Sequence, residues 1–303
     1  MSGRLGSYCG DELARIAHHD QRVCVLDADL ADSDGADQFQ RRHPDRFFQV
    51  GIAEQCMVSM AAGMASCGLR PWVFSFAAFV CYRAYDQIRL CVSAANQPVT
   101  IVGSHSGGCT GRNGKTHAAV NDLALMASLP NMSVWSPAGP SDVRLAMRSI
   151  LADNQPAYVR LPRNPVGDLP GPEEACRWLT PPAPVAMAST GLATHLALRA
   201  WQILQDAGLR VGLLHCPKVA PLPGDQVSES LRGVELLFVV EDHQSSRGFG
   251  TMLAELQLNA EIVNLGWPQG WLGESGDDEQ ILESCGLQPS QLAARIMDRV
   301  THK

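Results

Sequence analysis

The sequence lacks any cluster of basic residues. Its longest basic run is Arg41-Arg42, and 31 Asp and Glu residues outnumber 24 Lys and Arg residues, which gives a formal net charge of -7. Proteins that bind nucleic acid or an anionic membrane over a broad surface need clustered Lys and Arg. The charge distribution therefore argues against both classes of partner.

Cysteine pairs at metal-binding spacing are also missing. The ten cysteines form no Cys-x-x-Cys pair, and many lie inside apolar stretches, for example Cys24, Cys56, Cys67, Cys81 and Cys91. We expect them to be small hydrophobic residues of the core in a reducing compartment, without a zinc site.

A hydrophobic run long enough to cross a membrane is absent as well. Residues 56–79 are apolar, but Arg70-Pro71 after Gly68 divides them into a helix and a strand. Residues 1–20 lack the basic and apolar blocks of a signal peptide. We therefore expect a cytoplasmic protein.

What the chain does contain is a regular alternation of short β-prone runs and helical patterns. Its 303 residues suit two α/β domains. The alternation predicts a parallel sheet covered by helices on both faces. We expect its strands at residues 23–26, 47–50, 72–76, 99–102, 133–135 and 157–161.

Prolines interrupt this rhythm between residues 164 and 184, which indicates a linker. A second, shorter α/β unit follows. We expect its strands at residues 185–189, 211–215 and 236–240, and its helices at 194–207, from Gly250 and at 289–300. The predicted organisation is a first domain over residues 1–168, a linker over 169–184 and a second domain over 185–303.

Glu54 begins a predicted helix that has almost no polar side chains. We expect this helix to be buried on all sides. In a structural interpretation, Glu54 lies in the first turn because the helix dipole favours an anion there. In a functional interpretation, apolar walls raise the pKa of Glu54, so that it can share a proton with a ligand heterocycle.

Two further motifs follow Glu54. Phe76, Phe79 and Tyr82 are spaced to form one ridge in a helical turn, either as core packing or as a stacking face for a flat ring. His105 and His117 bracket a glycine-rich loop that follows a predicted strand. A loop histidine can be incidental, but imidazole can also donate to a developing oxyanion and move protons near neutral pH.

Together and in this order, these motifs resemble the transketolase family of thiamine-diphosphate enzymes. VGIAEQ resembles the family's cofactor-glutamate motif, SFAAFVCY its aromatic clamp, and HSGGCTGRNGKTH its substrate loop, whose histidines are twelve residues apart. VLDADLADS, YVRLPRN and VVEDHQSSRGFGTMLAEL also resemble family segments. The resemblance covers nearly the whole chain, but only the C-terminal half of a full-length transketolase. It implies a parallel-sheet pyrimidine-binding domain followed by a smaller α/β transketolase C-terminal domain.

For the cofactor, the resemblance implies five contacts. Glu54 would hydrogen-bond the aminopyrimidine ring of thiamine diphosphate and exchange a proton with it. Phe76, Phe79 and Tyr82 would stack on and enclose this ring. Asp29 would lie near the cofactor.

For the substrate, the resemblance implies that His105 and His117 bind hydroxyl groups and assist proton transfer. Arg163 would grip a sugar phosphate, with Ser33 nearby. Arg160 would instead pair with a carboxylate.

Two positions depart from the family's substrate loop. Asn113 stands where many transketolases have an aspartate that reads a substrate hydroxyl, and Ala118 replaces the usual glutamine. Asn113 would still contact the substrate, with a different preference for donors and acceptors.

The family's N-terminal half binds magnesium and the diphosphate through a Gly-Asp-Gly motif, which does not occur here. The resemblance therefore implies a partner subunit that holds Mg2+, and an α2β2 heterotetramer. The expected reaction transfers a two-carbon ketol unit from a ketose, often phosphorylated, to an aldehyde. The open alternatives are a beta-type subunit of a 2-oxoacid-decarboxylating thiamine enzyme and a non-catalytic regulatory homologue. A deoxyxylulose-phosphate synthase shares the I-A-E-Q motif, but His105 favours a transketolase.

Overall fold

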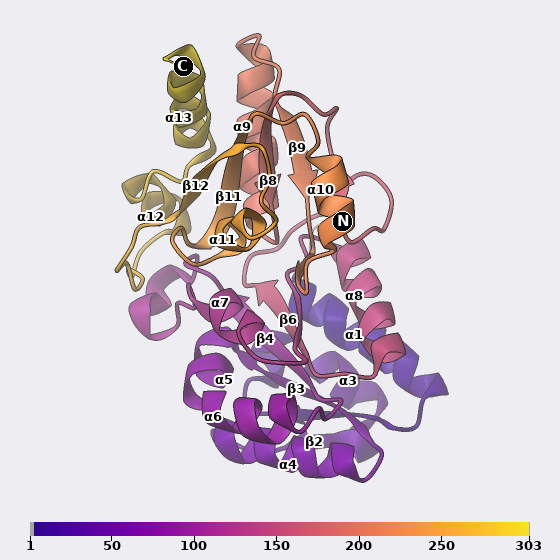
Figure 1. Ribbon diagram of the computed structural model, residues 1–303. Helices are drawn as coiled ribbons and strands as arrows, with labels where there is room; N and C mark the ends of the chain where they lie inside the picture. Colours follow the sequence, from indigo (N-terminus) through magenta and orange to yellow (C-terminus); the bar gives the residue numbers. More distant parts are fainter. Residues whose placement is uncertain (1–2, 303) are drawn as a thin grey trace.

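Two β-sheets organise residues 3–302, which are the residues that this computed structural model describes (Figure 1). The first sheet has the order β10-β5-β6-β4-β3-β1-β2, and only β10 runs antiparallel to its neighbour. Its strands are β1 (Val23–Asp27), β2 (Phe47–Gln49), β3 (Arg70–Phe76), β4 (Thr100–Ser106), β5 (Ser133–Trp135), β6 (Ala157–Pro162) and β10 (Lys218–Ala220). The six strands expected before residue 162 are thus confirmed as one parallel sheet.

Helices cover both faces of this sheet because its strands carry apolar side chains on both sides. In β1, Val23 and Val25 belong to the core that contains α1 and α8, whereas Leu26 belongs to the core that contains α4 and α5. The helical segments of this half are α1 (Leu5–His19), α2 (Ala31–Asp34), α3 (Asp37–Arg42), η1 (Pro44–Arg46), α4 (Glu54–Ser66), α5 (Ala77–Arg83), α6 (Tyr85–Gln87), the π-helix η2 (Ile88–Ala94), η3 (Gly111–Thr116), α7 (Asp122–Ala127) and α8 (Pro140–Asp153).

The second sheet has the order β12-β11-β8-β9-β7, and only β7 is antiparallel to its neighbour. Its strands are β7 (Arg177–Trp178), β8 (Val185–Ser189), β9 (Gly212–His215), β11 (Leu236–Gln244) and β12 (Glu261–Trp267). The helices of this half are α9 (Ala193–Asp206), α10 (Gly224–Ser230), α11 (Phe249–Ala254), α12 (Asp278–Ser284) and α13 (Pro289–Thr301). The predicted α/β fold class is confirmed, although the sequence patterns did not predict β12.

Two short strands, β10 and β7, come from segments outside the predicted domain whose sheet they join. β10 comes from the second half but pairs with β5 of the first sheet. β7 lies inside the proline-rich segment 169–184 and pairs with β9 of the second sheet. The sequence patterns did not predict either strand: β7 has only two residues, which carry no period, and β10 depends on its pairing with the first half.

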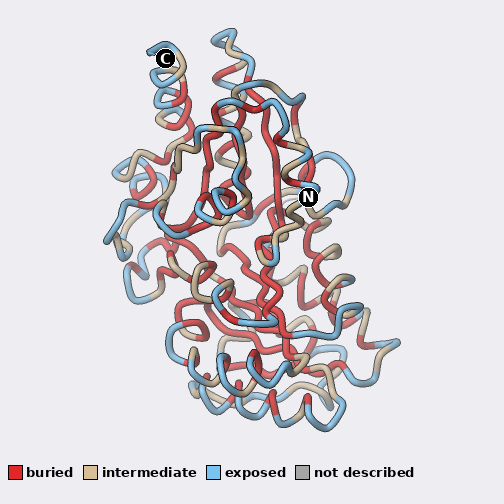
Figure 2. Tube along the Cα trace, in the orientation of Figure 1, coloured by how far each residue is buried: buried red, intermediate tan, exposed pale blue. Residues whose placement is uncertain are grey.

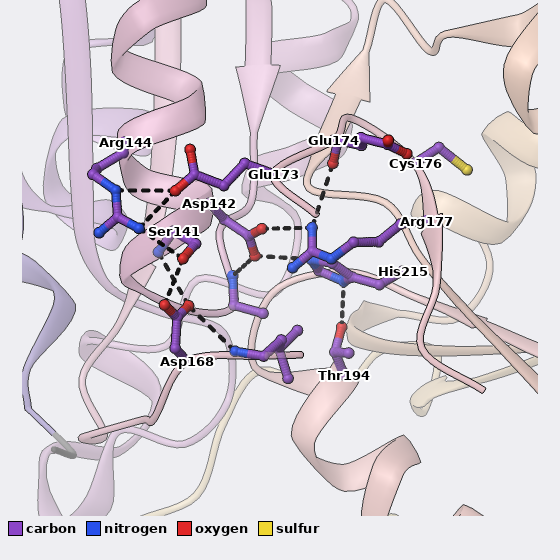
Figure 3. A network of polar contacts seen from close by, with 12 residues as sticks. Ser141, Asp142, Arg144, Asp168, Glu173, Glu174, Cys176, Arg177, Thr194 and His215 are labelled. Carbon is purple, nitrogen blue, oxygen red and sulfur yellow. Dashed lines mark hydrogen bonds and ion pairs between the residues drawn. The ribbon is translucent and has the colours of Figure 1, made fainter. Parts of the chain in front are cut away.

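A buried polar network joins the two halves beside β7 (Figure 3). Asp142, in α8, accepts a hydrogen bond from Arg177 Nη1 at 2.9 Å and contacts His215 Nε2, also at 2.9 Å. The hydroxyl of Thr194 in α9 contacts the other ring nitrogen of His215 at 2.8 Å. All four side chains are buried, so their interactions hold the first half firmly against the second.

Helix α4 differs from the prediction that it is buried on all sides. One face packs on the sheet, but Cys56, Ser59, Met60 and Gly63 are exposed on the outer face (Figure 2). The prediction was wrong because it assumed that apolar residues point only into the core of this one chain. An exposed face of small and apolar side chains is typical of a surface that another molecule covers.

The cysteines differ in burial, and Cys91 is intermediate. Cys24 and Cys81 are buried as expected, but Cys56 and Cys67 are exposed, so the prediction of core positions was wrong for these two. Both lie in or directly after α4. Across residues 3–302, no helix combines the length and the apolar character needed to cross a membrane.

Candidate active site

The carboxyl ends of neighbouring strands bring several predicted site residues to one edge of the first sheet. β1, β3 and β4 lie side by side. Asp29 follows β1 by two residues, Phe76 is the last residue of β3, and His105 is the last but one of β4. Ligands bind at this edge in open parallel sheets. Asp29 has a left-handed backbone with φ 65°, and its N–H donates to Gln49 Oε1 at 2.8 Å. This bond holds the turn after β1 against β2.

Glu54 begins α4 and is almost completely buried, with 1% of its surface exposed. Its two carboxylate oxygens accept hydrogen bonds from Arg83 Nη1 at 2.8 and 2.7 Å. Arg83 is the last residue of α5, and its guanidinium lies over the ring of Phe79, 4.9 Å from the centroid. The arginine offsets the desolvation of a carboxylate that the apolar helix would otherwise leave unpaired.

Phe76 and Phe79 form a stacked pair at the start of α5, with ring centroids 5.6 Å apart. Tyr82 does not continue this pair in the way that the three-residue spacing suggested. Its hydroxyl accepts a hydrogen bond from the N–H of Asn121 at 3.4 Å. Although Tyr82 is 42% exposed as a whole, desolvation of its hydroxyl, followed by the charge of Asp122, raises its pKa, so this phenol stays neutral in the physiological range.

His105 lies against the aromatic pair. Its ring stacks on Phe76 with centroids 3.9 Å apart. The backbone of His105 is left-handed, with φ 51°, where the pairing of β4 with β6 changes register, and such strained residues in strand bulges often redirect a side chain towards a site. Burial, followed by the positive charges of Arg163 and Arg4, lowers the pKa of His105 to about 4. His105 is therefore a neutral donor and acceptor at physiological pH.

His117 reaches the same aromatic pair from the other end of the loop. Gly107 and Ala119 exchange two backbone hydrogen bonds of 3.0 Å, which close the loop. The ring of His117 meets Phe79 edge-on at a centroid distance of 5.1 Å. Burial lowers the pKa of His117, so both histidines that the sequence singled out converge on the two phenylalanines.

The second half of the chain holds the loop between His105 and His117 in place. Gly108 N–H donates to Asp242 Oδ1 at 3.0 Å, and a Cβ atom on Gly107 would lie 1.8 Å from Asp242 Oδ2. Asp242 also pairs with Arg160, whose Nε lies 2.8 Å from Asp122. All three charged groups are buried, which confirms the expectation that Arg160 pairs with carboxylates.

Arg163 follows β6 and faces the outer end of the loop. Its guanidinium lies 3.1 Å from where a Cβ atom of Gly111 would stand, and Nη2 pairs with Asp278 Oδ2 at 2.5 Å. Asn113 is exposed on the same loop and lines the same cleft as Arg163. Ser33 lies in α2, where its hydroxyl contacts Asp32.

Three charged residues near the site were not predicted from the sequence motifs. Arg83 follows Phe79 by one helical turn, a spacing that could have identified it. Arg4 is brought towards the segment after β6 by the backbone pairing of Gly3 with Val166. Asp278 meets Arg163 across 115 residues of sequence, and no local pattern signals such a contact. Within residues 3–302, no three His, Cys, Asp or Glu side chains gather in a way that could hold a metal ion.

The comparisons with known proteins assign both halves. Residues 4–167 match the family model of the transketolase pyrimidine-binding domain, and residues 179–292 match that of the transketolase C-terminal domain. The chain is 32% identical to a transketolase family protein of Sinorhizobium fredii, over 95% of this chain and 87% of the relative. It is 30% identical to a transketolase C-terminal section of Methanocaldococcus jannaschii, over 96% of this chain and 94% of the relative.

Other relatives are longer. The chain is 31% identical to 1-deoxy-D-xylulose-5-phosphate synthase 2 of Geobacter sulfurreducens and spans 47% of its length. Among solved structures, a chain described as a split-gene transketolase in an inactive β4 tetramer superposes with a TM-score of 0.87, at 29% identity and with 97% of both chains covered. These findings, with the arrangement of Glu54, the stacked phenylalanines and the two histidines, show that the chain belongs to the transketolase family.

Proposed function

We propose that this chain is the smaller subunit of a split transketolase. It transfers a two-carbon ketol unit from a ketose, or a ketose phosphate, to an aldehyde acceptor. The observation that carries this proposal is the position of the Arg83 guanidinium. This flat, cationic donor bonds to the buried Glu54 and lies on the ring of Phe79, and a protonated aminopyrimidine needs the same two interactions.

Membership in the transketolase family implies dependence on thiamine diphosphate, and the residues at the sheet edge fit its pyrimidine end. Glu54 would accept a hydrogen bond from a ring nitrogen and hold a proton there. Phe76, Phe79 and Tyr82 would enclose the ring, and Asp29 would lie near the cofactor. When bound, the cofactor supplies the nucleophilic carbon that the protein side chains lack.

His105 and His117 would act on the substrate. Because the pKa of His105 is lowered to about 4, its ring is neutral. Nδ1 contacts the hydroxyl of Ser104 at 3.2 Å, so Nε2 would bond to a substrate hydroxyl. His117, on the opposite end of the closed loop, would take or return the proton of the hydroxyl next to the breaking carbon-carbon bond. Asn113, Ser33 and Arg163 would contact the rest of the sugar.

The partner in this proposal is an N-terminal-half transketolase subunit that binds Mg2+ and the diphosphate in an α2β2 heterotetramer. Among residues 3–302, five of the seven exposed large hydrophobic side chains lie in the stretch of sequence that contains Glu54: Phe48, Ile52, Met60, Tyr82 and Leu90. An apolar patch of this kind marks an interaction surface. The chain with the superposing fold comes from a split-gene transketolase, which supports a two-chain enzyme.

The test is to mix purified chain with the candidate N-terminal-half subunit, thiamine diphosphate and Mg2+. We expect ketol transfer to an aldehyde from the mixture and at least a hundredfold less from either chain alone, because each would hold only one end of the cofactor. Robust turnover by this chain alone would refute the split-subunit proposal. A mixture that binds thiamine diphosphate but lacks turnover with all donors would favour the regulatory homologue.

The relatives named 1-deoxy-D-xylulose-5-phosphate synthase support a second candidate, a thiamine enzyme subunit that uses a 2-oxoacid donor and releases carbon dioxide. The same mixture, supplied with a 2-oxoacid and an aldehyde, distinguishes the two candidates. Carbon dioxide release without transfer from any ketose would favour decarboxylation over ketol transfer.

A further inference from the structure

We propose that Asp278 is a specificity-determining residue that disfavours phosphorylated substrates. Its carboxylate neutralises Arg163, so that the outer end of the substrate cleft accepts a neutral, hydroxyl-bearing sugar in preference to a sugar phosphate. This inference rests on the proposed ketol-transfer function. It departs from the phosphate-gripping role that the resemblance implies for Arg163.

Both oxygens of Asp278 are engaged by the first half of the chain. Oδ2 pairs with Arg163 Nη2 at 2.5 Å, and Oδ1 accepts a hydrogen bond from the N–H of Gly111 at 2.8 Å. The side chain of Asp278 is 14% exposed and that of Arg163 is 37% exposed. These two contacts hold the carboxylate against the guanidinium, and a phosphate group would have to compete with it.

The cleft around this pair carries no net charge. It has a volume of about 630 Å³ and is lined by residues of the substrate loop, by Arg163 and by the start of α12. Its charged lining consists of Arg112, Arg163, Asp277 and Asp278. Two cations and two anions cancel, so a phosphate dianion gains little from the local field, whereas a hydroxyl can bond to Asp278 or Asn113 without breaking the ion pair.

The cleft is linked to the reactive side chains through Arg163, which lines it, whereas His105 does not. Arg163 is close enough to His105 for its charge to lower the pKa of that histidine, and His105 stacks on Phe76. Arg4 contributes a weaker effect on His105 but does not line the cleft. A sugar whose carbonyl end meets His105 would therefore direct its far end towards Arg163 and Asp278.

The variant Asp278→Asn removes the negative charge of this side chain and keeps its size. The amide oxygen can still accept from Gly111, but the amide nitrogen is a donor and cannot pair with the guanidinium. Arg163 is then free to bind a phosphate. The matched control is Asp277→Asn, which removes the same charge from the same cleft. Asp277 Oδ1 accepts from the N–H of Glu279 at 3.0 Å, so this change leaves the Arg163 pair in place.

In the assembled enzyme, kcat/KM is measured for ribose 5-phosphate and for ribose as acceptors, with erythrulose as the common donor. We expect Asp278→Asn to raise the ratio of the phosphorylated to the unphosphorylated acceptor about tenfold, and Asp277→Asn to change it by less than about threefold. The ratio is insensitive to partial loss of folded enzyme. Equal shifts in the two variants, or no shift in Asp278→Asn, would overturn the proposal.

A binding measurement judges the proposal even if the assembly transfers no ketol unit, a result that would instead refute the proposed function. The full-length chain is titrated with ribose 5-phosphate and with ribose by calorimetry. We expect Asp278→Asn to bind ribose 5-phosphate about tenfold more tightly than the unmodified chain, with unchanged affinity for ribose. The double variant Arg163→Met/Asp278→Asn should lose this gain. A gain that survives without Arg163, or an unmodified chain that already prefers ribose 5-phosphate more than tenfold, would contradict the proposal.

Discussion

The ion pairs that line the site differ from those that lie beneath it in the exposure of the arginine. Arg83 and Arg163, which face the site, have side chains that are 47% and 37% exposed. Arg160 and Arg177, which lie between the two halves of the chain, are each 2% exposed. All four arginines have a carboxylate partner, so the contrast is in access to solvent and not in pairing.

This difference separates two tasks. An exposed arginine can leave its carboxylate at small cost because water solvates the released guanidinium. A buried arginine cannot, since separation would strand two charges in a medium of low polarity. We therefore interpret the buried pairs as fixed supports between the two halves of the chain. The exposed pairs are contacts that a ligand can replace at a cost, which is higher for Arg163 because Gly111 also holds Asp278.

The largest expected effect comes from breaking a buried pair. Arg160→Met leaves Asp122 and Asp242 without their cation inside the protein. We expect the free energy of unfolding to fall by about 3–5 kcal/mol, measured by chemical denaturation at pH 7. The matched control is Arg148→Met, which removes an exposed arginine from Glu173 and should cost less than about 1 kcal/mol. Similar losses in the two variants would contradict the distinction between buried and exposed pairs.

The next prediction concerns Glu54, the carboxylate partner of the exposed Arg83. Glu54→Gln keeps the size of the side chain but cannot exchange a proton. We expect kcat of the assembled enzyme to fall by about 10³-fold, while circular dichroism and assembly with the partner remain unchanged. The control is Glu229→Gln. Glu229 lies in α10, far from Glu54 in the sequence, and forms an exposed pair with Arg232, so this change should leave kcat within twofold. A Glu54→Gln enzyme that keeps more than a tenth of its activity would remove Glu54 from the mechanism.

Asp142 tests a buried pair through its pH dependence. Burial alone would raise its pKa, but His215, Arg177 and the N–H of Ala138 outweigh burial and lower the pKa to about 2. Because the folded-state pKa lies below the ordinary value of 3.8, the stabilisation is complete above about pH 4 and is lost as the pH falls towards 2. Its magnitude is about 2 kcal/mol.

We expect Asp142→Asn to remove this part of the acid sensitivity between pH 4 and 2, as measured by denaturant unfolding at several pH values. Asp20 offers the exposed counterpart, because a hydrogen bond from Arg22 lowers its pKa to about 2 as well. Added salt should weaken the contribution of Asp20 to the free energy of unfolding but not that of Asp142. Parallel pH curves for Asp142→Asn and the unmodified chain would show that the buried carboxylate does not stabilise the fold in this way.

Much of the fold could be predicted from the sequence because its strands are short apolar runs separated by helical patterns. β8 and β5 were predicted at their observed bounds. β10 was missed because its pairing with β5 is decided by the other half of the chain, and β7 because two residues inside a proline-rich segment carry no period. The outer face of α4 was misjudged because composition alone does not tell a core from a surface that a partner covers.

The candidate site also contains residues that the sequence predicts and residues that it does not. Glu54, Phe76, Phe79, His105 and His117 could be identified because each belongs to a local motif with a fixed spacing, and the structure brings them together. The partners of the charged groups could not. Asp278 reaches Arg163 only through the packing of α12 on the substrate loop, and the left-handed backbone of His105 follows from a strand irregularity that has no signature in the sequence.

The smallest effect concerns the arginine that covers Glu54. Arg83→Gln removes a guanidinium that occupies both the carboxylate of Glu54 and the face of Phe79. Glu54 is buried, but the glutamine amide can still donate a hydrogen bond to its carboxylate and Arg83 is half exposed. We therefore expect a stability loss of only about 1 kcal/mol and a twofold to fivefold tighter binding of thiamine diphosphate by the assembled enzyme, measured by fluorescence titration. Arg89→Gln removes the same charge from an exposed pair with Asp86 on the next helical turns and should not change this affinity. Weaker binding in Arg83→Gln alone would mean that Arg83 holds the cofactor, and that an exposed arginine beside the site is a ligand contact and not a replaceable partner of Glu54.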